Sequence, residues 1–340
     1  VVRRYGEAPE APLRERVAKA LVNKGITLGS LNRSEEAIAA YDEVVRRYGD
    51  ATEAPLREQV ATALVNKGFR LGILNRSEEE IAVYDEVVRR YGDATEAPLR
   101  ERVATALVNK GFTLGSLNRS EEAIAAYDEV VRRFGDATEA PLRERVATAL
   151  VNKGYRLGIL NRSEEAIAAC DEVVRRFGDA PEASLRRSVA MAMVNEGDAL
   201  GSLNRSEDAI AVYDEVVRRY GDAPEAPLRE PVAEALVSKG VRLGSLNRNE
   251  EAITVYDEVV RRFGDAPEAP LREWVAKAIV NKGVTLGSLN RREEAVAVYE
   301  EVERRFGDAT EAELQRLVVK ARAQMGNSPP EPSPTPGAGA

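Results

Sequence analysis

Histidine is absent from this chain of 340 residues, and cysteine occurs once, as Cys170. Without histidine the chain lacks the commonest general base of enzymes and the nitrogen ligand that most zinc sites use. A single cysteine cannot form an internal disulfide, and Cys170 is expected to be a small buried residue rather than a reactive thiol. These absences exclude triad catalysis in its usual form and leave no catalytic or metal-binding residue to name.

Also missing are a long apolar run and an excess of positive charge. No apolar run approaches the roughly 20 residues that a membrane-spanning helix needs, and no secretory signal opens the sequence. The 49 basic and 57 acidic side chains are mixed along the chain and give a net charge of -8. Nucleic acids and anionic membranes attract basic surfaces, so neither is expected as a partner. We expect a cytoplasmic protein that uses no cofactor.

A repeat of 43 residues organises what is present. The segment VNKG, or a close variant of it, begins at seven positions: Val22, Val65, Val108, Val151, Val194, Val237 and Val280. The opening residues 1–6, VVRRYG, match residues 44–49 and are expected to be the end of a helix that starts upstream. The natural protein is therefore expected to be longer than this sequence.

Each repeat predicts two helices. In the first full repeat, apolar residues at three- and four-residue spacing predict an amphipathic helix over residues 12–31. Asn32 is expected to stop it in the left-handed conformation. Ser34 then caps a second helix, and Gly49 is expected to end that helix, again in the left-handed conformation. The chain should fold as antiparallel helix pairs joined by short turns.

The pattern resembles the tetratricopeptide repeat family. A large residue, a glycine, a second large residue, a small alanine and an aromatic recur at the family's spacing, here as Leu21, Gly25, Leu28, Ala37 and Tyr41. The resemblance implies an all-α fold, a right-handed superhelical solenoid of antiparallel helix pairs. About seven repeats and a C-terminal capping helix would make up the array.

The chain departs from the family in three ways. The period is 43 residues instead of 34, Lys24 replaces the usual leucine, and Glu80 occupies the small alanine site of the second repeat. The nine extra residues, such as 52–60, are expected to lengthen the first helix of each repeat. Superhelix dimensions of the family are therefore not carried over to this chain.

The domain organisation follows from the repeat. Residues 1–326 are predicted to form the helical array, with a last helix near residues 313–325 whose polar Arg322 suits a lid that faces water. Residues 327–340, rich in proline, glycine and serine, are expected to be a disordered tail or linker.

Asparagine recurs where the family's first helices line the concave groove. The positions are Asn23, Asn66, Asn109, Asn152, Asn195 and Asn281. A side-chain amide can bond both the N–H and the C=O of a peptide, so a ladder of asparagines would hold an extended backbone without reading its sequence. At about 1 kcal/mol each, such a ladder would bind weakly. The alternative is that these amides bond neighbouring helices of the array.

An apolar line runs beside the asparagines. It consists of Val22, Ile26, Val65, Phe69, Val108, Phe112, Val151, Tyr155, Val241 and Val284. These side chains would either pack against a bound peptide or contact the adjacent repeat. In the fifth repeat Asp198 takes a place in the line, where it would face a basic side chain of a partner or reflect drift in one repeat.

Three functions remain open at this point. The first is a non-catalytic scaffold that binds a protein or an extended peptide in the groove. The second, implied by the resemblance, is the sensor or substrate-recruiting arm of a larger bacterial-type signalling protein or enzyme. The third is a structural spacer that self-associates end to end, since near-identical repeats make each open end complementary to the other.

Overall fold

The computed structural model describes residues 10–326, and within this range the chain forms fifteen helices and no strand. The predictions for residues 1–6 and 327–340 lie outside the described residues. The chain divides into two compact units, Val1–Phe177 and Gly178–Ala340, called here the N-terminal and C-terminal units. No helix of the described range is long and apolar enough to cross a membrane.

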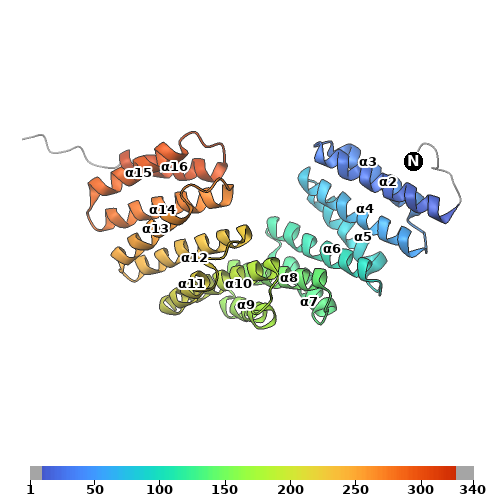
Figure 1. Ribbon diagram of the computed structural model, residues 1–340, viewed down its shortest axis with the longest axis horizontal. Coiled ribbons are helices and arrows are strands. Elements are labelled where there is room, and N and C mark those ends of the chain that lie inside the picture. Colours follow the sequence, from blue (N-terminus) through green and yellow to red (C-terminus); the bar gives the residue numbers. More distant parts are fainter. Residues whose placement is uncertain (1–9, 327–340) are drawn as a thin grey trace, which may run out of the picture. The chain divides into compact units, whose positions relative to one another are not determined.

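The N-terminal unit contains four helix pairs. The first helices, each of 20 residues, are α2 (Ala11–Ser30), α4 (Ala54–Ile73), α6 (Ala97–Ser116) and α8 (Ala140–Ile159). The second helices, each of 15 residues, are α3 (Ser34–Tyr48), α5 (Ser77–Tyr91), α7 (Ser120–Phe134) and α9 (Ser163–Phe177). Within this unit each helix packs on the next along the chain, and the first helices α2, α4, α6 and α8 contact one another in order (Figure 1).

The C-terminal unit repeats this arrangement. Its first helices are α10 (Ala183–Ser202), α12 (Ala226–Ser245) and α14 (Ala269–Ser288). Its second helices are α11 (Ser206–Tyr220), α13 (Asn249–Phe263) and α15 (Arg292–Phe306), and α16 (Ala312–Gly326) follows as a last, single helix. The first helices α10, α12, α14 and α16 contact one another in order (Figure 1). The all-helical repeat fold predicted from the sequence is confirmed.

Asparagine ends the first helix of each repeat, as predicted. Asn32 has a φ of 58°, and its N–H bonds to the carbonyl of Gly29, while the N–H of Arg33 bonds to the carbonyl of Leu28. This pair of bonds satisfies the last free carbonyls of the helix and turns the chain toward its partner. The equivalent residues are Asn75, Asn118, Asn161, Asn204, Asn247 and Asn290.

Two predictions about the second helix are wrong. Arg33, not Ser34, is the N-cap, because the N–H of Ala37 bonds to the carbonyl of Arg33 at 3.0 Å. Ser34 is the buried first residue of α3. Gly49 keeps the right-handed conformation, with a φ of -57°. The glycine is needed for space instead: its carbonyl accepts a hydrogen bond of 3.0 Å from Arg90 of the next repeat, and a Cβ there would lie 3.1 Å from the same guanidinium.

The core of each helix pair is a tyrosine packed on a glycine. Tyr41 is 1% exposed, and a Cβ on Gly25 would lie 2.4 Å from its ring. The same contact recurs in the repeats that keep the tyrosine, which confirms the close helix approach predicted for this glycine. In the fourth repeat Cys170 replaces the tyrosine and is fully buried, as predicted.

The lysine that departs from the family pattern joins neighbouring repeats. Lys67 Nζ lies 2.6 Å from Asp42 Oδ1 on the second helix of the preceding repeat. Equivalent bridges link Lys110 with Asp85, Lys153 with Asp128, Lys239 with Asp214 and Lys282 with Asp257. At the end of the array, Arg322 of α16 is exposed and binds Glu303 through two hydrogen bonds of 2.6 and 2.5 Å.

Candidate functional site

The asparagines singled out in the sequence occupy equivalent places on successive first helices. In the N-terminal unit, Asn23 is exposed on α2, and Asn66, Asn109 and Asn152 are half-buried on α4, α6 and α8. In the C-terminal unit, Asn195 and Asn281 are half-buried on α10 and α14. The predicted positions therefore lie at the surface of the first helices, within reach of a partner.

Two of these amides contact the preceding repeat. Asn109 Nδ2 donates a hydrogen bond of 3.4 Å to the hydroxyl of Tyr84 on α5. Asn152 lies beside Tyr127 and lowers the pKa of this tyrosine, which burial raises to about 12. Such a bond uses one of the amide's two donors and leaves its carbonyl oxygen available. The same asparagine side chain can therefore bond a neighbouring helix and still offer groups to a peptide backbone.

The apolar line separates into a buried and an exposed set. Val22, Val65, Val108 and Val151 are 3–6% exposed, so of the two alternatives left open for the line, packing within the array applies to these four residues. The exposed set in the N-terminal unit lies one turn beyond the asparagines and is called here the apolar row. Its members are Ile26 (47% exposed), Phe69 (54%), Phe112 (64%) and Tyr155 (53%).

Arginines flank the apolar row on alternate helices. The guanidinium of Arg70 lies 5.2 Å from the ring centre of Phe69, and that of Arg156 lies 5.3 Å from that of Tyr155. Arg70 Nη1 also donates to the carbonyl of Gly29 at 3.1 Å, in space that a Cβ on Gly29 would fill. Each arginine therefore lies across the preceding helix and adds positive charge beside the row.

Sequence analysis missed these arginines, although the sequence carries a signal for them. Thr27, Arg70, Thr113 and Arg156 occupy equivalent positions in the first four repeats, at 43-residue intervals. Threonine and arginine therefore alternate at this position with a period of two repeats. A comparison of alternate repeats, rather than of consecutive ones, would have found the pattern.

Asp198 differs from the row residues whose place it takes. It is half-buried on α10 and accepts a hydrogen bond of 2.7 Å from the hydroxyl of Tyr213. Burial raises the pKa of Asp198, while the Tyr213 bond and the nearby Arg242 lower it. The carboxylate is therefore already partnered within the C-terminal unit, although one side of it faces a pocket.

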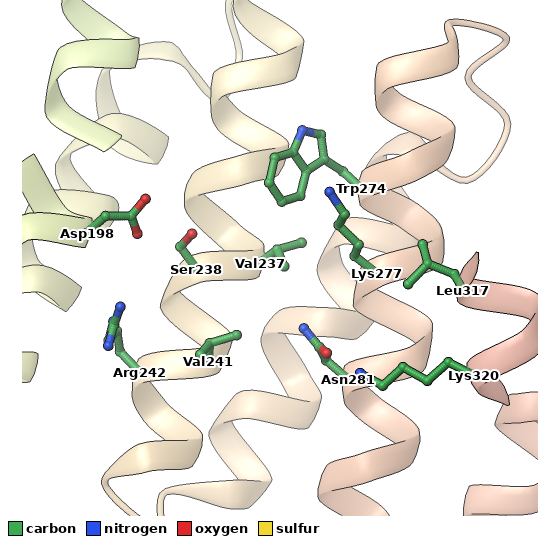
Figure 2. A pocket seen from close by; sticks show the side chains of 10 residues that line it. All are labelled: Asp198, Val237, Ser238, Val241, Arg242, Trp274, Lys277, Asn281, Leu317 and Lys320. Carbon is green, nitrogen blue, oxygen red and sulfur yellow. The ribbon is translucent and has the colours of Figure 1, made fainter. Parts of the chain in front are cut away.

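That pocket, of about 290 Å³, lies on the first helices of the C-terminal unit. Figure 2 shows side chains from α10, α12, α14 and α16 around it, with Lys277 directed toward the indole of Trp274 and Lys320 extending toward Asn281. Lys277 Nζ lies 4.4 Å from the Trp274 ring centre and 3.9 Å from Glu313 Oε1. The pocket thus combines an aromatic wall with several cationic groups.

Among residues 10–326, no group of three or more histidine, cysteine, aspartate or glutamate side chains is placed to hold a metal ion.

Comparison with known sequences identifies the repeat. One profile described as tetratricopeptide repeat matches residues 109–181, 152–224 and 194–267, and a second with the same description matches residues 18–50 and 276–305. A search of curated proteins finds no match to the sequence.

Solved structures share the architecture at low sequence identity. A tetratricopeptide repeat protein from Parabacteroides merdae is 12% identical, with a TM-score of 0.57 over 90% of this chain and 98% of that one. The apo form of RapI is 10% identical, with a TM-score of 0.62 over 91% and 86%. A Rap protein complexed with Competence and Sporulation Factor is 12% identical, with a TM-score of 0.52 over 92% and 78%. At these identities the likeness concerns the fold.

Proposed function

The chain belongs to the tetratricopeptide repeat family of helical interaction scaffolds, and from that premise we propose that it binds an extended segment of a partner protein. The segment would lie across the first helices of the N-terminal unit, from α2 to α8. The observation that carries this proposal is the apolar row, four large side chains about half exposed at the same level of adjacent helices.

The spacing of the row suits a particular backbone. Packed helices lie about 8–10 Å apart, so consecutive row residues would be met about once every 9 Å. A polyproline II segment rises about 3.1 Å per residue and returns to the same face every third residue, which is the same distance. We therefore expect the partner to carry apolar side chains at every third position. A β-strand, whose faces alternate, would match this spacing less well.

Polar groups beside the row would add to the binding. The asparagine amides would offer groups to the peptide backbone. Asn109, for example, uses one donor for Tyr84, and its second donor and its carbonyl oxygen can still bond a peptide. Arg70 and Arg156 would favour acidic residues between the apolar ones, since their guanidinium groups stand next to Phe69 and Tyr155. The Rap protein bound to Competence and Sporulation Factor gives a precedent for partner binding by this fold.

The test is binding of residues 1–340 to a peptide array that contains sequences with apolar residues at every second, third and fourth position. One variant carries Asn66→Ala, Asn109→Ala and Asn152→Ala, and a second carries Phe69→Ser, Phe112→Ser and Tyr155→Ser. A control with Leu31→Ser and Leu117→Ser removes apolar residues that are exposed at the helix turns. Circular dichroism checks that every variant keeps its helices.

We expect the wild type to bind peptides with apolar residues at every third position. This binding should be lost in the variant with serines in the apolar row and kept in the control. Loss in the asparagine variant as well would assign the backbone contacts to the amides. Equal binding by the row variant and the wild type would refute the proposal. A cytoplasmic location and a place within a larger signalling protein stay predictions.

A further inference from the structure

A groove lies between the second helices α5 and α7 of the N-terminal unit. Both helices pack on α6, and within the described residues neither contacts the other (Figure 1). Lys110 and Leu114 of α6 line the groove, and each is two residues from Phe112. Because two residues on a helix are separated by about 200°, the groove opens on the other side of α6 from the apolar row.

We propose that this groove binds an amphipathic helix of a partner protein, one that places a large apolar side chain in the groove between two basic residues. The partner helix would lie along α7 and contact only second helices and the outer side of α6. The groove and the apolar row are separate surfaces, so this inference does not rest on the proposed function.

The floor of the groove is apolar and has room for an incoming side chain. Leu107 and Leu114 line it and are 4% and 1% exposed. Lys110 stands where the family pattern has a leucine, and its ammonium group is bonded to Asp85 on α5 at 2.5 Å instead of packing an apolar group into the groove. Ala126 is 7% exposed, and four other repeats have a larger residue at its position. These residues are Val83, Val212, Val255 and Val298.

The size of the groove suits one anchoring side chain. A volume of about 400 Å³ accommodates a leucine, methionine or phenylalanine side chain, but not a whole helix. Helices that bind in grooves use such side chains as anchors while the rest of the helix stays at the surface. The occupant is therefore expected to be a surface-bound helix with one large apolar residue at the groove.

Charge favours a basic partner. Helix α5 contains five acidic and two basic side chains, and α7 contains four acidic and two basic ones. Glu122 and Glu129 line the α7 side of the groove, and hydrogen bonds from arginines lower the pKa of both, to about 2 for Glu129. Both carboxylates are therefore ionised at neutral pH.

These carboxylates can still accept hydrogen bonds from a partner. A carboxylate has about four acceptor sites on its two oxygens. Arg119 donates two hydrogen bonds to Glu122, and Arg132 and Arg133 together donate three to Glu129. A lysine or arginine of the partner can bond the remaining sites, and the arginines of α7 hold both carboxylates in position for it.

The spacing of the carboxylates sets the pattern of the partner. Glu122 and Glu129 are two turns apart on α7, which is about 10.5 Å along the helix axis. Ala125 and Ala126 lie between them and line the groove. A partner helix that lies along α7 has the same rise, so basic residues at i and i+7 would meet the carboxylates while an apolar residue at i+3 or i+4 enters the groove.

Fluorescence anisotropy of a labelled peptide measures binding to residues 1–340. The peptide has about 15 residues, rich in alanine to favour a helix, with lysine at i and i+7 and leucine at i+4. Two matched peptides replace the leucine by alanine or both lysines by glutamate. Ala126→Val narrows the groove with the residue of other repeats, and Ala40→Val makes the same change on α3, which does not line the groove.

A second pair of variants tests the charges. Glu122→Gln combined with Glu129→Gln removes both carboxylates from the groove. Glu36→Gln combined with Glu43→Gln is the matched control at the equivalent positions of α3. Circular dichroism checks that every variant keeps its helices.

We expect saturable binding of the leucine peptide that is about tenfold weaker in Ala126→Val, because the leucine is no longer buried, and unchanged in Ala40→Val. The groove glutamine variant should bind about fivefold more weakly and lose most of the salt dependence, unlike its control. No saturable binding by the wild type, equal binding of the leucine and alanine peptides, or equal binding by Ala126→Val and the wild type would overturn the proposal. Equal or tighter binding of the glutamate peptide would overturn the assignment to a basic helix. The serine variant of the apolar row should bind the leucine peptide normally, so failure of one surface can be told from failure of the other.

Discussion

Replacement of Glu234 by glutamine should stabilise the C-terminal unit, and the gain should depend on pH. Glutamine has nearly the shape of the neutral carboxyl but cannot ionise. The carboxyl ionises with a pKa of about 7 in the folded chain, against an ordinary value of 4.5. Each tenfold difference in proton affinity between folded and unfolded states corresponds to about 1.4 kcal/mol.

The sign follows from the direction of the pKa. Because the folded state binds the proton more tightly, Glu234 lowers the free energy of unfolding progressively as pH rises from about 4.5 to about 7. The stability of Glu234→Gln relative to the wild type should therefore be near zero at about pH 4.5. It should rise to a plateau of about 3 kcal/mol above about pH 7.

Urea unfolding, followed by the emission of Trp274 at several pH values, measures this difference. Glu293→Gln makes the same chemical change at an exposed position of α15 and should give a small difference at every pH. Histidine is absent, so no imidazole titrates in the same range and obscures the comparison. A difference that stays flat from about pH 4.5 to 8, or a variant that is less stable at about pH 8, would refute the reasoning.

Three further changes test the packing of the N-terminal unit by thermal unfolding. Gly68→Ala should destabilise it by about 1–3 kcal/mol, because the new Cβ would lie 2.4 Å from the Tyr84 ring; no loss would contradict the close approach. Glu80→Ala should stabilise it, since Glu80 is 8% exposed at a site where other repeats have alanine. Burial raises the pKa of Glu80, so the gain should be larger at neutral pH than in acid, and the opposite trend would count against this account. Lys110→Met should cost less than about 1 kcal/mol, because its bridge to Asp85 is exposed to solvent, and added salt should shrink the effect; an effect that does not respond to salt would show that the lysine acts by packing.

The fold could be predicted because the same 43-residue repeat recurs along the sequence. Apolar spacing, the asparagine of the turn and the glycine under Tyr41 are local signals, and each recurs at 43-residue intervals. Gly49 was mispredicted for a complementary reason. Its local sequence suits a left-handed helix end, but its role is to admit Arg90, which comes from the next repeat.

The candidate sites were harder to predict. Val22 and Ile26 are one turn apart on the same helix, yet one is 3% and the other 47% exposed, because the neighbouring first helix covers only part of that face. The C-terminal pocket depends on side chains from four helices, and the pKa of Glu234 is raised by burial and by the charges of Asp198 on α10 and Glu230 on α12. Such properties require the distances between helices, which a repeat pattern does not give.

The arginines beside the apolar row restrict which deletions of repeats keep the contacts between first helices. Arg70 rests on Gly29 and Arg156 rests on Gly115, one pair of repeats further along. Removal of the second and third repeats together would place Arg156 against Gly29, which is the same kind of contact. Removal of the third repeat alone would bring Arg156 to Gly72, where the carboxylate of Glu80 already lies. At this junction the contact between arginine and glycine is therefore kept when a pair of repeats is removed and lost when the third repeat alone is removed.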